Sequence, residues 1–280
     1  FRILMTDIAV PTTVRRTVAF SPAVYQGHMQ VEDVTGVLCD SVKVAEQEIQ
    51  NGNIAIMVDE TARCIHEFHP DVVVDAILAK HNLGTKITDA PFVVGVGPGF
   101  TAGEDCNCVV ETKRGHTLGN VIWDGSAIPN TGVPGNVGGY SIERLIKASA
   151  DGGIEPKAVI GDLVRKGQIV AITGGEPVYA LMDGIVRGML QPGVQVTKGL
   201  KIGDIDARAK QEHCRTISDK ARAIGGGVLD AVCSYEKSRG KYALILLAAG
   251  QSVRFGSDKL KAVVEGEAMY ESAISRFEAF

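Results

Sequence analysis

The sequence lacks any apolar run that approaches the roughly 18 residues needed to cross a bilayer, and no signal peptide is visible at its start. It also lacks an excess of positive charge. The formal net charge is −4, which argues against a protein built to bind nucleic acid. The six cysteines lack the spacing of small secreted domains, so reduced thiols are expected rather than disulfides. These absences predict a cytoplasmic protein with no membrane and no nucleic-acid partner.

Both ends of the sequence look cut. Phe1 is not a methionine and lies inside an apolar run, and the region that starts at residue 242 stops at Phe280, too early for a complete nucleotide-binding domain. We therefore expect a fragment that is truncated at both ends.

Residues 1–150 alternate short apolar runs with polar and helical patterns, which predicts a Rossmann-like α/β domain. A helix is expected over 41–50 from a Ser41 cap, and strands over 1–5, 54–59, 71–76 and 92–100. Asp7 follows the first strand. An acid at the end of a strand binds ribose hydroxyls in dinucleotide folds, so Asp7 is a candidate cofactor ligand; the alternative is a strand-end residue without a binding role.

Two glycine-rich stretches are candidate binding loops. Gly97-Pro98-Gly99 follows a strand directly, where glycines let a backbone approach a ligand or phosphate, although a plain strand-ending turn would look the same. The second stretch, over residues 111–131, is suited to an anionic ligand because its polar groups donate several hydrogen bonds. Its candidate residues are Glu111, Arg114, His116, Asn130 and Thr131. The alternative is a surface ion pair between Glu111 and Arg114.

Cys106 and Cys108 share one face of a strand. A metal site would need two more ligands, and nothing nearby supplies a second pair of cysteines. Two small buried residues are therefore expected.

Residues 155–206 contain a duplication. The pattern Gly161-x-x-Val164-x-Lys166-Gly167-x-x-Val170 recurs 32 residues later from Gly193 to Ile202. Short strands and glycine turns repeated in this way predict a small β sandwich with pseudo-twofold symmetry. The spacing resembles the biotinyl/lipoyl-carrier type of barrel-sandwich hybrid. Carriers need a lysine between the two halves, but residues 168–197 contain none, so no biotin or lipoate is expected and a docking role remains.

Asp204 and Asp206 follow this module and could hold a divalent ion with their carboxylate oxygens, although a solvated turn is the alternative. A helix capped by Ser218 is expected over 216–232, interrupted at Gly225–Gly227, and Lys220 near these glycines could meet a phosphate. Residues 234–241 are polar and are predicted to be a linker.

The last region predicts a nucleoside-triphosphate site. A buried strand over 243–247 is followed by small residues with free amides and then by two cations. The candidate residues are Ala248, Ala249, Gly250, Ser252, Arg254 and Lys259. This motif resembles MobA/MocA-like nucleotidyltransferases, which implies CTP, Mg²⁺ and transfer of CMP to molybdopterin. The magnesium-binding acid of those enzymes would lie beyond Phe280, so the transfer is expected only in an intact fusion protein.

Over residues 1–233 several motifs occur together, including "ILMTDIAVPTTVRRTVAFS", "APFVVGVGPGFTAGED", "VVETKRGHTLGNVI" and "NTGVPG". They resemble the selenium-dependent molybdenum hydroxylase accessory family (YqeB-type). The resemblance implies a maturation factor that acts on the molybdenum cofactor, with the hydroxylase as its partner. The alternatives are a molybdenum cofactor cytidylyltransferase in the intact fusion and an NAD(P)-binding oxidoreductase. The predicted domains are residues 1–150, 151–207, 208–233 with a linker over 234–241, and 242–280.

Overall fold

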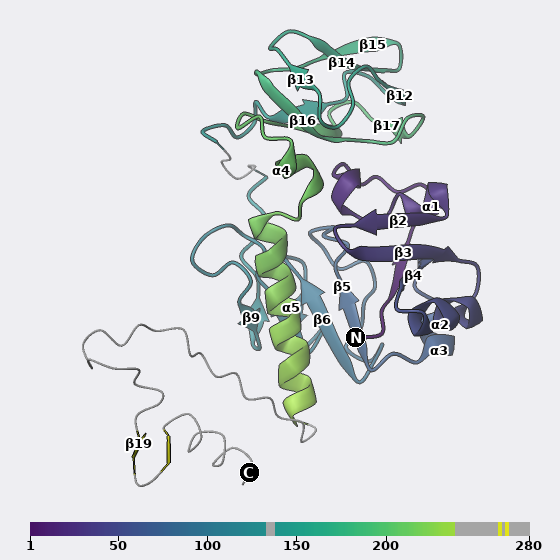
Figure 1. Cartoon of the computed structure of the whole chain (residues 1–280), viewed down its shortest axis with the longest axis vertical. Coiled ribbons are helices and arrows are strands. Elements are labelled where there is room, and N and C mark those ends of the chain that lie inside the picture. The colour runs from purple at the N-terminus through teal and green to yellow at the C-terminus, as the bar shows by residue number, and fades with distance from the viewer. Residues whose placement is uncertain (133–137, 239–262, 265–266, 269–280) are drawn as a thin grey trace. The chain divides into compact units, whose positions relative to one another are not determined.

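The computed structural model describes residues 1–132 and 138–238 and two short strands, β19 (Val263–Val264) and β20 (Glu267–Ala268) (Figure 1). The chain divides into two compact units, Phe1–Ala231 and Val232–Phe280. The first unit contains two sheets with parallel strands and an all-β module, whereas β19 and β20 pair antiparallel in the second. No helix in the part of the chain that the structure describes is long and apolar enough to cross a membrane.

The first sheet has the strand order β1-β4-β3-β2, with β2 antiparallel at its edge. Its strands are β1 (Leu4–Asp7), β2 (His28–Val31), β3 (Val34–Cys39) and β4 (Ile54–Val58). The helix α2 (Val42–Gln50) packs on this sheet through a core that includes Ala45 and Ala55. It begins as predicted, because the Ser41 hydroxyl accepts a hydrogen bond from the Val44 amide at 3.4 Å. The short helices of this region are η1 (Arg16–Val18), α1 (Ala23–Gln26) and α3 (Ile65–Phe68).

The second sheet has the order β5-β6-β8-β9, in which β5, β6 and β8 are parallel. The strands are β5 (Val72–Asp75), β6 (Phe92–Val96), β8 (Cys108–Val110) and β9 (Val121–Ile122), and β7 (Thr101–Ala102) pairs separately with β10 (Gly125–Ser126). Every residue of β6 and β8 is buried. Their continuous apolar sequence is what parallel strands covered on both faces require.

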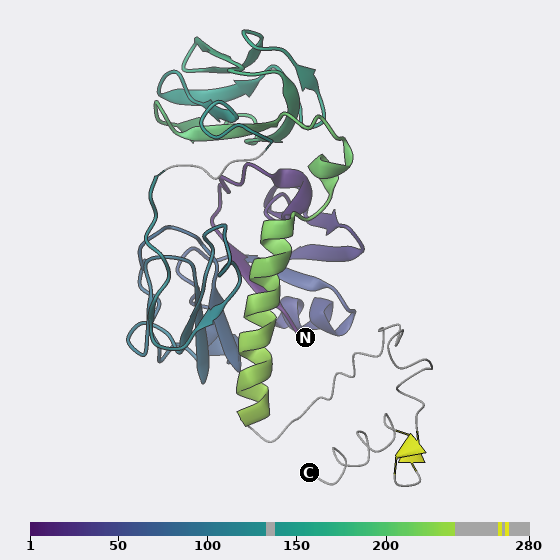
Figure 2. The same ribbon diagram turned by 90° about the vertical axis from the view of Figure 1, so that its left-hand side faces the viewer.

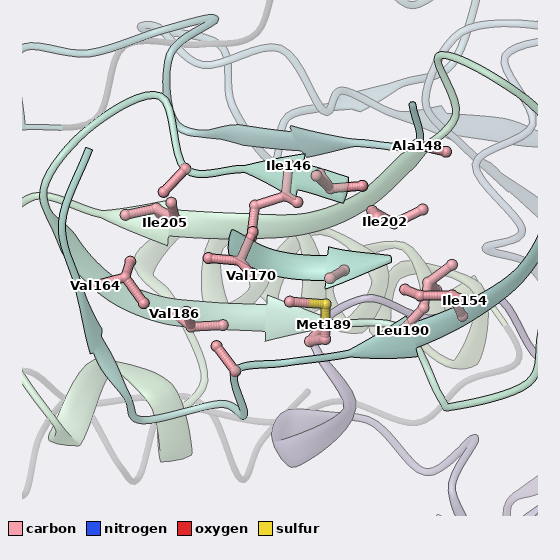
Figure 3. Close-up of a cluster of buried hydrophobic side chains, with 14 of the residues drawn as sticks. Ile146, Ala148, Ile154, Val164, Val170, Val186, Met189, Leu190, Ile202 and Ile205 are labelled. Carbon is pink, nitrogen blue, oxygen red and sulfur yellow. The ribbon is translucent and has the colours of Figure 1, made fainter. Parts of the chain in front are cut away.

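The β module consists of two four-stranded antiparallel sheets with the orders β11-β18-β16-β13 and β15-β14-β12-β17. Side chains from both sheets form one core, which includes Ile146, Val170, Val186 and Ile202 (Figure 3). The strands are β11 (Leu145–Lys147), β12 (Gly152–Pro156), β13 (Leu163–Val164), β14 (Ile169–Thr173), β15 (Glu176–Tyr179), β16 (Gly184–Met189), β17 (Gln195–Val196) and β18 (Lys201–Asp206).

The sequence repeat is visible in the contacts of the module. Asp151 accepts a hydrogen bond from the Lys198 amide, and Asp183, 32 positions later, accepts one from the Lys166 amide, both at 2.7 Å. A 32-residue shift also converts the order of one sheet into the order of the other, strand by strand. Each sheet therefore takes two strands from each copy of the repeat.

The chain leaves the module through α4 (Glu212–Arg215) and α5 (Asp219–Ser238). Contrary to the prediction, Gly225–Gly227 does not interrupt α5, and the first five residues of the predicted linker are helical. The part of α5 that belongs to the first unit, up to Ala231, runs alongside the strands of the second sheet (Figure 1 and Figure 2). A β carbon on Gly227 would lie 2.1 Å from the carbonyl oxygen of Gly119. This contact explains why a glycine is retained inside the helix.

Gly225 and Gly227, both in α5, make a matched pair of substitutions. We expect Gly227→Ala to lower the free energy of unfolding by more than about 1 kcal/mol, because the added methyl group meets backbone that cannot move away freely. Gly225 is exposed with nothing within 4 Å of an added β carbon. Gly225→Ala should therefore raise the free energy of unfolding by about 0.5–1 kcal/mol. Urea unfolding monitored by circular dichroism measures the free energy of unfolding of both variants. The same change in both would contradict this packing of α5.

Candidate functional site

Three neighbouring parallel strands of the second sheet end at the same edge. Asp75 ends β5, Gly97–Gly99 follows β6, and Glu111 follows β8. In open α/β sheets, ligands bind in the crevice outside the carboxyl ends of the strands. This edge, which we call the carboxyl edge, is therefore the candidate functional site.

Gly97 and Gly99 let the loop after β6 pack against two other loops. Their φ angles, +89° and +113°, lie in the left-handed region. A β carbon on Gly99 would lie 2.5 Å from the His81 Cα, and one on Gly97 would lie 2.9 Å from the Thr112 Oγ1. The Gly97 amide is also occupied, since it donates to the Val110 carbonyl at 2.9 Å. Loop packing accounts for both glycines, and their contact with a ligand stays a prediction.

The loop after β5 contributes residues that sequence reasoning missed. Leu78 and Lys80 adopt left-handed φ angles of 60° and 70°, which cost non-glycine residues about 1–2 kcal/mol each. The loop is held at its far side, where the Thr85 hydroxyl donates to the Asp75 carboxylate at 2.6 Å. Strained backbone of this kind is concentrated at functional sites. Nothing in the sequence marks these two residues, because neither residue type favours the left-handed region.

Glu111 holds the loops of the carboxyl edge together. Its carboxylate is 2% exposed and accepts hydrogen bonds from the amides of Thr112 and Lys113, both at 2.7 Å, and of Ile128 at 2.8 Å. The surface ion pair with Arg114 considered from the sequence is absent, because Glu111 is buried among backbone donors. Its observed contacts are structural, and its contact with a ligand stays a prediction.

Arg114 pairs with the first residue of α5. Its guanidinium donates to both carboxylate oxygens of Asp219, at 2.6 and 2.8 Å. The hydrogen bonds from Arg114 hold the pKa of Asp219 well below its usual range. The next residue, Lys220, is partly buried, and burial followed by the nearby Arg114 charge lowers its pKa. Among the described residues, no hydrogen bond or ion pair reaches its ammonium group.

The other predicted ligand-binding residues are placed differently. His116 is exposed in the loop between Glu111 and Asn120, and Asn130 and Thr131 are exposed shortly before residue 133. Asp7 belongs to the first sheet, at the end of β1. Burial raises the pKa of Asp7, against the hydrogen bond that its carboxylate accepts from the Ile8 amide.

Asp204 and Asp206, the predicted metal ligands, are paired with arginines. Both carboxylates are buried. Arg144 donates to Asp204, while Arg208 donates to the two oxygens of Asp206 at 2.9 and 2.7 Å, and an Arg187 nitrogen lies 3.6 Å away. The guanidinium groups supply the counter-charge that a divalent ion would supply. Over the described residues, no group of three or more histidine, cysteine or acidic side chains is arranged to hold a metal.

Hydrogen bonds also tie the N-terminal region to α4, the helix that follows the β module. Arg15 donates to the carbonyl of His213 in α4 at 2.9 Å, and the Thr17 hydroxyl donates to the carbonyl of Cys214. Burial, and then the charge of Arg187, lower the pKa of Arg15 to about 10. The partners are nearly 200 positions apart in the sequence, so no local pattern could have revealed them.

Two further predictions concern cysteines and the nucleotide site. Cys106 and Cys108 are both fully buried, and burial raises the pKa of Cys108 to about 12. The predicted nucleotide-binding residues lie outside the described residues, and they are Ala248, Ala249, Gly250, Ser252, Arg254 and Lys259.

These features define a mixed α/β protein with several sheets and few helices. No family model matches the sequence. The chain is 48% identical over 232 residues to the uncharacterized protein YqeB of Escherichia coli (strain K12). The match covers 83% of this chain and 43% of that protein, so the chain spans less than half of the relative's length.

Two solved structures show weaker likenesses. A succinylglutamate desuccinylase/aspartoacylase from Rhodobacter sphaeroides is 26% identical with a TM-score of 0.22, over 24% of this chain and 22% of its own. The product-bound ectoine utilization protein EutE (DoeB) from Ruegeria pomeroyi is 13% identical with a TM-score of 0.23, over 72% of this chain and 84% of its own. Neither score is high enough to indicate a shared fold.

We expect Glu111→Gln to loosen the carboxyl edge. A glutamine amide nitrogen cannot accept a hydrogen bond, so at least one of the three backbone donors loses its partner, at a cost of about 1–3 kcal/mol. Urea unfolding should report this loss, and hydrogen exchange should become faster around residues 112, 113 and 128. Glu104→Gln, at an exposed position, is the control. Two variants of equal stability would refute the structural role of Glu111.

Asp206 should contribute stability that depends on pH. Burial alone would raise its pKa, but the hydrogen bonds from Arg208 lower it to about 2. Since this is below the unfolded value of about 3.9, the stabilisation is present above pH 4 and is lost as the pH falls toward 2. Between pH 5 and pH 2, wild type should therefore lose about 2 kcal/mol more than Asp206→Asn.

The measurement is the free energy of unfolding in urea across this pH range. Asp230→Asn, at an exposed position on α5, controls for the removal of one acid. Parallel acid limbs for wild type and Asp206→Asn would contradict the assignment.

Proposed function

We propose that the chain is the accessory part of a longer cytoplasmic protein that binds the molybdenum cofactor and helps to mature a selenium-dependent molybdenum hydroxylase. The motifs of the YqeB-type accessory family and the 48% identity to YqeB support this proposal. In it, the molybdenum cofactor is the ligand that the chain carries, and the hydroxylase is the partner that receives it.

The observation that carries the proposal is the charge at the carboxyl edge. Glu111 and Arg114 are satisfied by protein groups, whereas the ammonium of Lys220, a partly buried residue, has no protein partner within the described ranges. An uncompensated cation in such a position suits a ligand with a negative group. Molybdopterin has a phosphate and a planar ring system. In this proposal the edge loops receive the cofactor, with Lys220 and Lys80 as candidate contacts for its anionic part.

The β module has a separate role in this proposal. We regard it as a barrel-sandwich hybrid without a carrier lysine, set beside a Rossmann-like α/β region, and as the docking module for the hydroxylase. A shallow hollow of about 250 Å³ on its surface supports a docking role. The lining includes the exposed apolar side chains of Ile142, Tyr179 and Leu181. Exposed apolar patches on a soluble fold commonly mark protein contacts.

A second candidate function is a molybdenum cofactor cytidylyltransferase in the intact fusion. The motif from Leu247 to Lys259 favours it, and CTP with Mg²⁺ would be its substrates. The NAD(P)-binding alternative rests on Asp7 at the end of β1.

The test is cofactor binding by the whole chain under anaerobic conditions. Molybdopterin released from a molybdenum hydroxylase is added, unbound pterin is removed by gel filtration, and bound pterin is quantified by its fluorescence after oxidation. We expect saturable binding, weakened about tenfold by Lys80→Glu, which reverses a charge beside the carboxyl edge. Lys43→Glu, an exposed site on α2, is the control.

Parallel titrations with CTP plus Mg²⁺ and with NADPH separate the alternatives. Absence of molybdopterin binding would overturn the accessory function. Binding of CTP that is lost in Arg254→Ala and Lys259→Ala would favour the transferase, and binding of NADPH that is lost in Asp7→Asn would favour the oxidoreductase.

A further inference from the structure

We propose that the hollow on the β module binds an acidic segment of a partner protein. The segment inserts one large apolar side chain into the hollow and pairs its carboxylates with Lys147 and Lys201. This inference rests on the docking role that the proposed function gives to the β module, and it adds the chemistry of the partner.

The hollow lies where the two halves of the repeat meet. It is formed by β11 and β15, each of which is the outer strand of its own sheet. The 32-residue shift of the repeat carries β11 onto β15, so the pseudo-twofold axis of the module passes between them. The residues that line the hollow include three equivalent pairs, which are Leu145 with Pro177, Lys147 with Tyr179, and Ser149 with Leu181.

The two halves present opposite chemistry beside the hollow. Lys147 of β11 lies directly opposite Lys201 of β18 in the sheet register, and both residues are exposed. At the equivalent places of the other sheet, Tyr179 of β15 lies opposite Ile169 of β14, and both of these are exposed as well. One flank of the hollow is therefore cationic and the other is apolar, although the repeat gives them the same backbone positions.

The cationic flank has more positive charge than its acidic neighbour balances. Like charges directly opposite each other on antiparallel strands destabilise a sheet. The Lys201 ammonium lies 3.5 Å from an oxygen of Asp204, but the same oxygen is already bound by Arg144. Within the described residues, no acid forms an ion pair with Lys147. A carboxylate from outside the chain would relieve this repulsion, so the flank is complementary to an acidic partner.

The size and lining of the hollow favour a single apolar side chain. Its volume of about 250 Å³ is below the roughly 300–1,000 Å³ of pockets that hold small molecules. The Ser149 hydroxyl in its lining is already committed, because it donates to the Glu176 carbonyl at 3.1 Å and lies 3.1 Å from the Thr173 Oγ1. A small apolar hollow of this kind suits one anchoring residue of a protein interface.

A protein segment fits this surface better than an anionic membrane does. Recognition of anionic lipid uses clusters of about four to eight Lys or Arg residues, whereas two lysines flank this hollow. Lipid also receives apolar side chains that project from a protein, and a hollow instead receives a group that projects from its partner. One apolar anchor with acids beside it satisfies both flanks at once.

The experiment selects binders to the immobilised whole chain from a random peptide library displayed on phage. We expect the enriched peptides to combine a large apolar residue with acidic residues. The affinity of one enriched peptide, labelled with fluorescein, is then measured by fluorescence anisotropy. Lys147→Glu should weaken binding about tenfold through reversal of a charge, and Leu181→Ser should weaken it about tenfold through loss of apolar contact.

Matched controls lie at the opposite edge of the same sheet. Leu163 is exposed on the outer strand β13, and Lys166 is exposed in the turn that follows. Leu163→Ser and Lys166→Glu should bind the peptide like wild type, and added salt should weaken the wild-type complex. Equal affinity of wild type and Lys147→Glu, or enrichment of peptides without acidic residues, would overturn the inference.

A second readout separates binding from a structural role. Without peptide, Lys147→Glu should melt at the same temperature as wild type or higher, because an opposite-charge pair with Lys201 replaces a like-charge pair. A lower melting temperature would reveal a stabilising partner for Lys147 within the chain, against the inference.

Two other occupants are tested in parallel. Self-association of wild type in sedimentation experiments, lost in Leu181→Ser, would assign the surface to a second copy of this chain. Co-sedimentation with vesicles of phosphatidylserine and phosphatidylcholine, lost in Lys147→Glu, would assign it to a membrane. Either result would overturn the inference.

The outcomes also separate this inference from the proposed function. If an acidic peptide binds as expected but molybdopterin does not bind, the docking surface stands and the accessory function fails. If molybdopterin binds but no acidic peptide is enriched, cofactor binding stands and the docking surface fails.

Discussion

The close approach of α5 to the loop between Glu111 and Asn120 is the contact on which the candidate site depends. Two glycines face each other there, and a β carbon on Gly119 would lie 2.4 Å from the Ala223 carbonyl oxygen. Only backbone without side chains can come so near. Because the helix lies this close, its first turn reaches the loop after β8. Asp219 pairs there with Arg114, and Lys220 lies within electrostatic reach of Arg114 and Glu111.

The protein satisfies its buried carboxylates in two different ways. Glu111 is surrounded by backbone amides, so its charge is stabilised by dipoles and its geometry fixes two loops. Asp206 is surrounded by guanidinium groups, and its charge links the β module to the segment that leads into α5. Burial of a charge is tolerated when partners replace water, so both carboxylates hold the fold together.

The sequence was most informative where structure depends on neighbouring residues. The Ser41 cap, the apolar strands and the buried valines of the repeat all follow from local spacing, and the structure has them in those places. Helical propensity was misleading at Gly225–Gly227, because tertiary packing at Gly227 outweighs the cost of glycine in a helix. The pairing of Arg114 with Asp219, across 105 positions, has no local signature. The burial of Asp204 and Asp206 has no local signature either, because their acidic sequence resembles a solvated turn or a metal site.

The interleaving of the two repeats in the β module has a consequence for how this part of the chain can vary. Since each sheet draws strands from both copies, neither copy contains a complete sheet, and the arrangement is that of two exchanged subunits joined into one chain. Removing either copy would leave two half-sheets with open edges and half a core. Residues 145–206 are therefore indivisible, and rearrangements of the gene can gain, lose or relocate the module only as a whole.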